Sequence, residues 1–133
     1  MSLEKAIHQR WAADAKLQER LPAEYLFTGR VSRDQTPYAT LWRLGSRTVW
    51  RTAAGDLLEE VQLALRLWHS EYEQLRAVVE QVRRLLDRSS FELEEGGRVT
   101  ALRVDQQRYR QEPEGRWLAE LEMTAQVYWP PED

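Results

Sequence analysis

The sequence of 133 residues contains no cysteine, which excludes disulfide bonds, thiolate nucleophiles, and zinc or iron–sulfur sites that depend on thiolate ligands. It has two histidines, His8 and His69, too few for a histidine metal site at a recognised spacing. No apolar run approaches the ~20 residues of a membrane helix, and the first residues lack the charged and then apolar layout of a secretion signal. We therefore expect no metal, no membrane partner and a cytoplasmic location.

Charged residues are numerous but mixed in sign, with 19 Lys and Arg against 22 Asp and Glu and a formal net charge of −3. Because acidic and basic side chains alternate along most segments, no basic stripe suited to a phosphate backbone forms. We therefore expect no direct contact with nucleic acid. The length and the 42% hydrophobic composition fit a single domain, residues 1–133, with one core.

Strict alternation of apolar and polar residues predicts two long strands. In residues 117–129 every odd position is apolar, while even positions such as Glu120 and Glu122 are polar, so one face of the strand is dry. This apolar set is Trp117, Ala119, Leu121, Met123, Ala125, Val127 and Trp129. Residues 57–69 alternate in the same way, which predicts a second strand of the same sheet.

Two helices are predicted from three- and four-residue spacing of apolar side chains. The first covers residues 3–21 and ends at Pro22. Ser70 and Glu73 have the spacing of a capping box and predict the start of the second, which runs to about Arg88. We expect its apolar stripe to cover the dry face of the sheet. The stripe consists of Tyr72, Leu75, Val78, Val79, Val82, Leu85 and Leu86.

The remaining segments read as shorter strands and turns. Strands are predicted over residues 25–31, 38–44, 91–93 and 98–109, and turns over 94–97 and 112–115, while residues 53–56 interrupt the strand pattern. Gly45 and Ser46 predict a tight hairpin that returns along residues 47–52, with a long loop as the alternative. The fold class predicted is α+β: a mixed, largely antiparallel sheet with an N-terminal helix and a central helix packed on one face.

The sequence offers no recognisable catalytic group. Neither histidine has the context of a catalytic base, so we interpret both as structural, with His69 orienting the chain at a helix start. The pairs Glu59-Glu60 and Glu94-Glu95 would serve acid–base chemistry only if burial raised one pKa. Both flank turns or strand starts, where charge is ordinarily solvated. We expect a protein that is not an enzyme and has no cofactor.

The densest cluster of aromatic and arginine side chains lies in residues 38–52. Its members are Tyr38, Trp42, Arg43, Arg47, Trp50 and Arg51. Such side chains are enriched in protein–protein contacts, so as a group they mark the candidate protein interface. The alternative for the individual residues is that Trp42 is part of the core and Trp50 covers its edge.

The layout of the chain resembles a known family, the tail-completion or tail-terminator proteins of long-tailed bacteriophages and prophages. An N-terminal helix leads to a strand and then to a second strand anchored by Pro37 and Tyr38. A variable loop, the alternating strand 61–68, the capped helix 70–88 and a meander with an acidic, glycine-containing turn at 112–115 follow. The similarity covers nearly the full length.

The resemblance implies a structural protein of a phage or prophage head–tail junction. Such proteins associate into a ring, often a hexamer, that caps the tail tube and joins it to the head connector, so the implied partners are copies of the chain and other tail or head-connector proteins in an assembled virion. Two alternatives stay open. One is a cone-shaped α+β domain that binds a small ligand or acts as an enzyme, with a pocket lined by Trp42, Trp117 and Trp129. The other is an adaptor that binds through a sheet edge.

Overall fold

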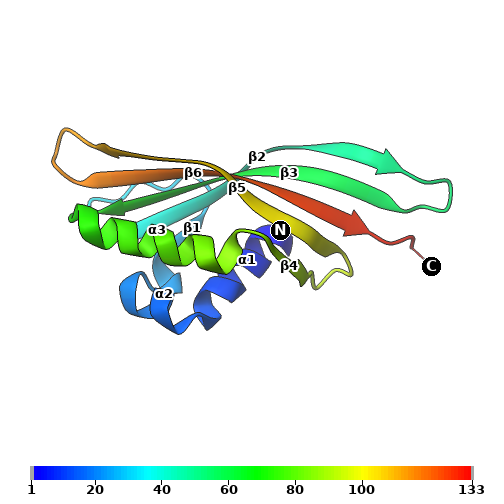
Figure 1. Cartoon of the computed structure of the whole chain (residues 1–133), viewed down its shortest axis with the longest axis horizontal. Coiled ribbons are helices and arrows are strands. Elements are labelled where there is room, and N and C mark those ends of the chain that lie inside the picture. Colours follow the sequence, from blue (N-terminus) through cyan, green and yellow to red (C-terminus); the bar gives the residue numbers. More distant parts are fainter. Residues whose placement is uncertain (1, 133) are drawn as a thin grey trace.

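The computed structural model describes residues 2–132 and has an α+β architecture (Figure 1). Its helices are α1 (Ser2–Ala13), α2 (Ala15–Arg20), the short 3-10 helix η1 (Ala23–Tyr25) and α3 (Tyr72–Leu86). Its strands are β1 (Leu26–Thr28), β2 (Tyr38–Arg51), β3 (Leu57–His69), β4 (Ser89–Glu92), β5 (Arg98–Gln111) and β6 (Trp117–Trp129). The predicted α+β class is confirmed.

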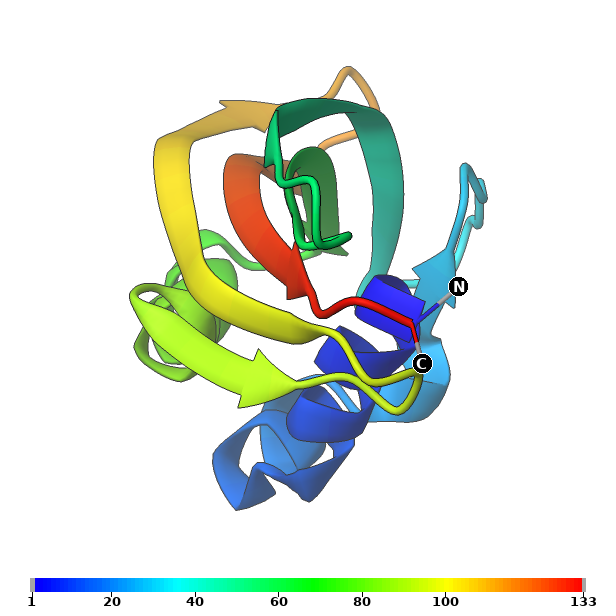
Figure 2. The same cartoon turned by 90° about the vertical axis from the view of Figure 1, so that its right-hand side faces the viewer.

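The strands form one mixed sheet in the order β1-β2-β3-β6-β5-β4. β1 runs parallel to β2, whereas the β2–β3, β3–β6, β6–β5 and β5–β4 pairs are antiparallel. The sheet is strongly curled, as the view along the long axis of the molecule shows (Figure 2). The central strands β3 and β6 have the bounds that alternation predicted, and they pair without a register shift from Leu57–Trp129 to His69–Trp117.

The core lies between the helices and the inner face of the sheet, the face that carries the apolar residues of β3 and β6. Trp11 of α1, Leu17 of α2 and Val82 of α3 are all 0% exposed and belong to one cluster with that face. The strand residues of the cluster include Val61, Leu63, Leu65, Leu67, Ala119, Leu121, Met123, Ala125 and Val127. A smaller cluster of Tyr38, Trp68 and Leu118 lies on the outer face.

The predicted helix over residues 3–21 is wrong in one respect, because the chain breaks at Asp14 into α1 and α2. Asp14 adopts an extended backbone conformation, and its carboxylate accepts a hydrogen bond from the Leu17 N–H at 2.9 Å. An aspartate in this position favours a new helix start over continuation, since its side chain satisfies an amide that would otherwise lack a partner.

The predicted hairpin at Gly45 and Ser46 is also wrong. β2 continues through both residues to Arg51, and the register with β3 shifts between Arg43 and Gly45, the mark of a β-bulge. Glycine is common at such bulges as well as in tight turns, so Gly45 was compatible with either structure. The chain turns instead between Thr52 and Asp56, where residues 53–56 interrupt the strand pattern.

α3 begins one residue later than the capping box indicated, with Glu71 and not Ser70 as its N-cap. Its first residue is Tyr72, and the extended residue before it, Glu71, makes no side-chain capping bond. Instead the Glu71 N–H donates to Nδ1 of His69 at 3.0 Å. The predicted role of Ser70 is therefore wrong, whereas the prediction that His69 orients the chain at this helix start is confirmed.

The burial of the His69 ring makes the stability of the fold depend on pH. Burial lowers the pKa of His69 below its ordinary value of about 6.5. The unfolded chain thus binds more protons at His69 than the folded chain, and stability falls as the pH drops below about 6.5 through the folded-state pKa. Denaturation midpoints at pH 7.5 and pH 5.5 should show this loss in the native chain. His69→Gln, which keeps an acceptor that does not titrate, should lose less; an equal loss would contradict the assignment.

Candidate interaction surface

The outer edge of β2 is only partly covered by another strand. β1 pairs with β2 over Ala39–Leu41, so residues 42–51 have no strand on that side within the described structure. This stretch carries the large exposed apolar side chains of residues 2–132: Leu44 is 49% exposed, Val49 38% and Trp50 42%. Unpaired backbone groups together with exposed apolar side chains are the features of an edge that accepts another strand.

The stretch belongs to an arm, formed by the β2–β3 hairpin, that extends well past the helices (Figure 1). The arm is held to the sheet at its tip, where the Tyr128 hydroxyl donates to the Asp56 carboxylate. That hydrogen bond and a second one from Thr52 lower the pKa of Asp56. The Trp50 and Tyr128 rings lie 6.5 Å apart at an angle of 50°. The arm is therefore an ordered part of the sheet and presents its free edge in a fixed position.

The structure brings together three of the six predicted interface residues. Arg47, Trp50 and Arg51 are exposed on the arm, and Arg47 pairs across the strands with Glu60 at 3.2 Å. Leu44 and Val49 were missed, although both lie in the same run of sequence. A reading of residues 38–51 as one strand, not a hairpin, would have placed them on an edge.

The other three predicted residues lie elsewhere. Tyr38 is fully buried and stacks on Trp68 with ring centroids 4.5 Å apart and planes 9° apart. Trp42 is half-buried on the outer face. Arg43 reaches the inner side and pairs at 2.8 Å with Glu4, which is 2% exposed. Tyr38 therefore offers no exposed surface to a partner in this structure.

The opposite edge of the sheet is also half-covered. β4 pairs with β5 from Arg98 to Leu102, so residues 103–111 of β5 have no strand on their outer side in the described part of the chain. The arginines on this stretch are neutralised locally. Arg103 pairs with Asp105 at 2.7 Å, while Arg108 and Arg110 lie 3.7 and 3.8 Å from Glu120.

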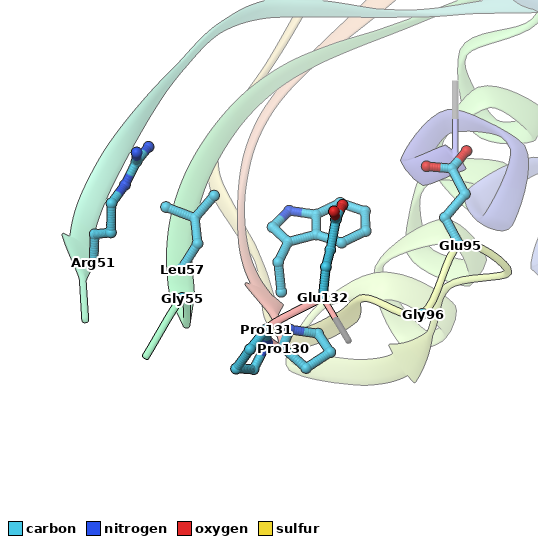
Figure 3. Close-up of a pocket in the computed structure, with 9 residues that line it drawn as sticks. Arg51, Gly55, Leu57, Glu95, Gly96, Pro130, Pro131 and Glu132 are labelled. Atoms are coloured by element: carbon cyan, nitrogen blue, oxygen red, sulfur yellow. The ribbon is translucent and has the colours of Figure 1, made fainter. Parts of the chain in front are cut away.

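A hollow of about 710 Å³ lies on the inner face beyond the helices (Figure 3). Arg51 and Leu57 of the arm line one side, Glu95 and Gly96 another, and Trp129 with the C-terminal prolines the third. The three tryptophans expected in a common pocket do not meet here. Trp117 and Trp129 are at opposite ends of β6, and Trp42 is on β2.

The carboxylates considered for acid–base chemistry lack the necessary environment. Glu94 is exposed and accepts from Nζ of Lys5 at 2.9 Å and from Gln9 at 3.2 Å. The hydrogen bond from Lys5 lowers the pKa of Glu94, whereas a general acid needs a raised one. Residues 2–132 contain no group of three or more His, Asp or Glu side chains arranged to hold a metal ion. None of their helices is long and apolar enough to cross a membrane.

Comparison with known protein families identifies the chain. The family model for tail completion protein gp17 matches residues 5–127. The chain belongs to this family. This tail completion protein is thus a structural protein of the phage head–tail junction, as its layout had predicted.

Solved structures share the fold of this tail completion protein. One is a chain in the virion of a native gene transfer agent particle, with a TM-score of 0.75 and 16% identity over 96% of both chains. A second solved chain has a TM-score of 0.64 and 15% identity over 98% of this chain and 96% of the other. At these identities the likeness concerns the fold alone. No curated protein matches the sequence.

Proposed function

We propose that this tail completion protein acts by assembling with copies of itself into a ring at the end of the tail tube, without catalysis. The observation that carries the proposal is the pair of half-free edges on one sheet, residues 42–51 of β2 and 103–111 of β5. Two different complementary patches on one subunit produce head-to-tail contacts, and such contacts close into rings when the rotation between subunits allows it.

The two free edges suit each other in direction. Three antiparallel pairings separate β2 from β5, so the two strands run in opposite directions. If neighbouring copies continue one sheet, the β2 of one copy meets the β5 of the next as an antiparallel pair, the more stable kind. The free stretches also have nearly the same length.

The covered halves of the edges do not obstruct this contact. β1 covers the beginning of β2, and β4 covers the beginning of β5. If the neighbour is displaced along the strands by about half a strand, the free part of its β5 meets the free part of β2. The β4 strand of the neighbour then lies beyond the end of β2, and β1 lies beyond the end of the neighbour's β5. In a closed ring such a stagger is accommodated by tilting the strands relative to the ring axis, as in barrels.

The remaining surfaces are then available to other components. We propose a hexameric ring in the assembled virion, with tail and head-connector proteins bound to its two faces. The absence of catalysis is supported by the use of the candidate acid–base groups in structural contacts, with Glu94 bound to Lys5 and His69 to the start of α3.

Loss of the protein from a particle-producing host tests this function. We expect heads and tails to accumulate unjoined, with tails of variable end structure, and the purified chain added to an extract to restore joining. Electron microscopy of the separated heads and tails, before and after addition, is the measurement. Joined particles that form in the absence of the chain would contradict the proposal. So would an extract in which the added chain restores joining but is not bound to the joined particles.

A further inference from the structure

A second hollow, of about 280 Å³, lies on the outer face at the beginning of β2 and the end of β3. We call it the indole pocket. Its charged and hydrogen-bonding lining includes Arg30, Thr40, Trp42, Arg66, Trp68, Glu112 and Arg116. The sequence offered no motif for it, because these residues come from four separate segments that only the fold brings together.

Three residues that line the indole pocket carry buried polar atoms without a hydrogen-bond partner among the described residues. Thr40 is 1% exposed and Trp68 is 8% exposed, yet neither the Thr40 hydroxyl nor the Trp68 Nε1 has a partner among the described residues. The Nε1 of Trp42 is likewise buried and unpartnered there. Buried polar side-chain atoms are usually paired, so three unpartnered ones in one hollow point to a missing ligand.

Three guanidinium groups surround these atoms. Arg66 lies 4.9 Å and Arg30 5.6 Å from the centre of the Trp42 ring, and Arg116 lies 5.8 Å from that of Trp68. Arg116 is neutralised by Glu112 at 2.7 Å, and Arg66 is 3.6 Å from Glu120. Arg30 is exposed and makes no ion pair within residues 2–132. Its positive charge is therefore available to a ligand.

The lining selects for an anionic oxygen ligand. Indole N–H and guanidinium groups only donate hydrogen bonds, and the Thr40 hydroxyl can also donate. Glu112 and Glu114 pair with Arg116, and Glu120 pairs with Arg66. These three carboxylates would repel a polyphosphate chain, whereas a single carboxylate can approach Arg30. The aromatic walls suit the methylene groups of an acidic side chain.

We propose that the indole pocket binds an acidic side chain on a peptide segment of a neighbouring protein in the particle. The presence of such a neighbour rests on the proposed function. Binding itself is measured on the isolated chain, so a failure to bind and a failure to join heads to tails are separate results.

The experiment uses the full ¹⁵N-labelled chain and its tryptophan indole N–H signals in NMR spectra, assigned with Trp→Phe variants. The probe is a blocked peptide, acetyl-Gly-Glu-Gly-Glu-Gly-amide, added to about 10 mM, the range for contacts of a few kcal/mol. We expect the signals of Trp42 and Trp68 to move with saturation and that of Trp11 to stay. The control peptide has Gln in place of both Glu residues. Unmoved Trp42 and Trp68 signals, or equal movement of these signals with the control peptide, would overturn the proposal. So would stronger binding of a single-stranded oligonucleotide.

Variants test the residues. Arg30→Gln should weaken binding about fivefold or more, as the loss of a charge-assisted contact implies. Arg98→Gln is the matched control, since Arg98 is also exposed but lies on β5 and pairs with Glu92; it should bind as the native chain does. Thr40→Val should weaken binding without loss of folding, because its hydroxyl has no partner to lose. Equal affinities for Arg30→Gln and Arg98→Gln would overturn the assignment.

Discussion

Trp11→Ala is expected to lower the free energy of unfolding by about 3–5 kcal/mol, a large part of the 5–15 kcal/mol typical of a domain. Trp11 is 0% exposed and packs within the core cluster shared by the helices and the sheet. Its Nε1 also donates to the carbonyl oxygen of Leu21 at 2.8 Å, which fixes the chain after α2. The substitution removes the largest fully buried side chain and leaves that carbonyl without its partner.

Chemical denaturation followed by circular dichroism measures the effect. Trp50→Ala is the matched control, because it removes the same side chain from a position that is 42% exposed. We expect its unfolding free energy to stay within about 1 kcal/mol of the native value. Trp11→Phe should fall between the two, since it keeps most of the packing and loses the hydrogen bond. If the two alanine variants were equally stable, Trp11 would not hold the helices to the sheet.

The elements that the sequence predicted well are those in which one physical signal dominates. β3 and β6 are central strands with one buried face, so apolar alternation defines their full length. The stripe of α3 likewise marks its buried side. At the N-terminus, the apolar spacing continues through residues 3–21, but the Asp14 side chain satisfies a local amide and breaks the helix. Periodicity cannot detect such a local competition.

The candidate surface could be predicted only in part, for a different reason. The enrichment of Arg and aromatic residues in 38–52 is visible in the sequence, and it led to β2, the strand whose free edge we propose as a ring contact. Whether an edge is free depends on how far β1 extends along β2, and β1 pairs with only a short stretch of it. The unpartnered polar atoms of the indole pocket are equally invisible, because their lack of a partner is a property of the packed sheet.

Placing two lysines on the free edge of β2, as Leu44→Lys with Val49→Lys, is expected to weaken ring assembly at least about tenfold while the chain stays folded. Both side chains are exposed, so their replacement removes no core packing. Lysines on an edge strand oppose the approach of another strand, a device by which proteins protect sheet edges. Sedimentation velocity over a range of concentrations measures the assembly, and circular dichroism the folding.

The matched control adds the same charge elsewhere. Ala12→Lys with Ala13→Lys places two lysines at exposed positions at the end of α1, next to α2 and outside residues 42–51 and 103–111. This variant should assemble at the concentration that the native chain requires. The edge variant should need at least about tenfold more protein, which corresponds to a loss of about 1.4 kcal/mol per contact. If both variants assembled equally well, strand pairing through residues 42–51 would be excluded as the ring contact; loss of assembly in both would assign the effect to net charge.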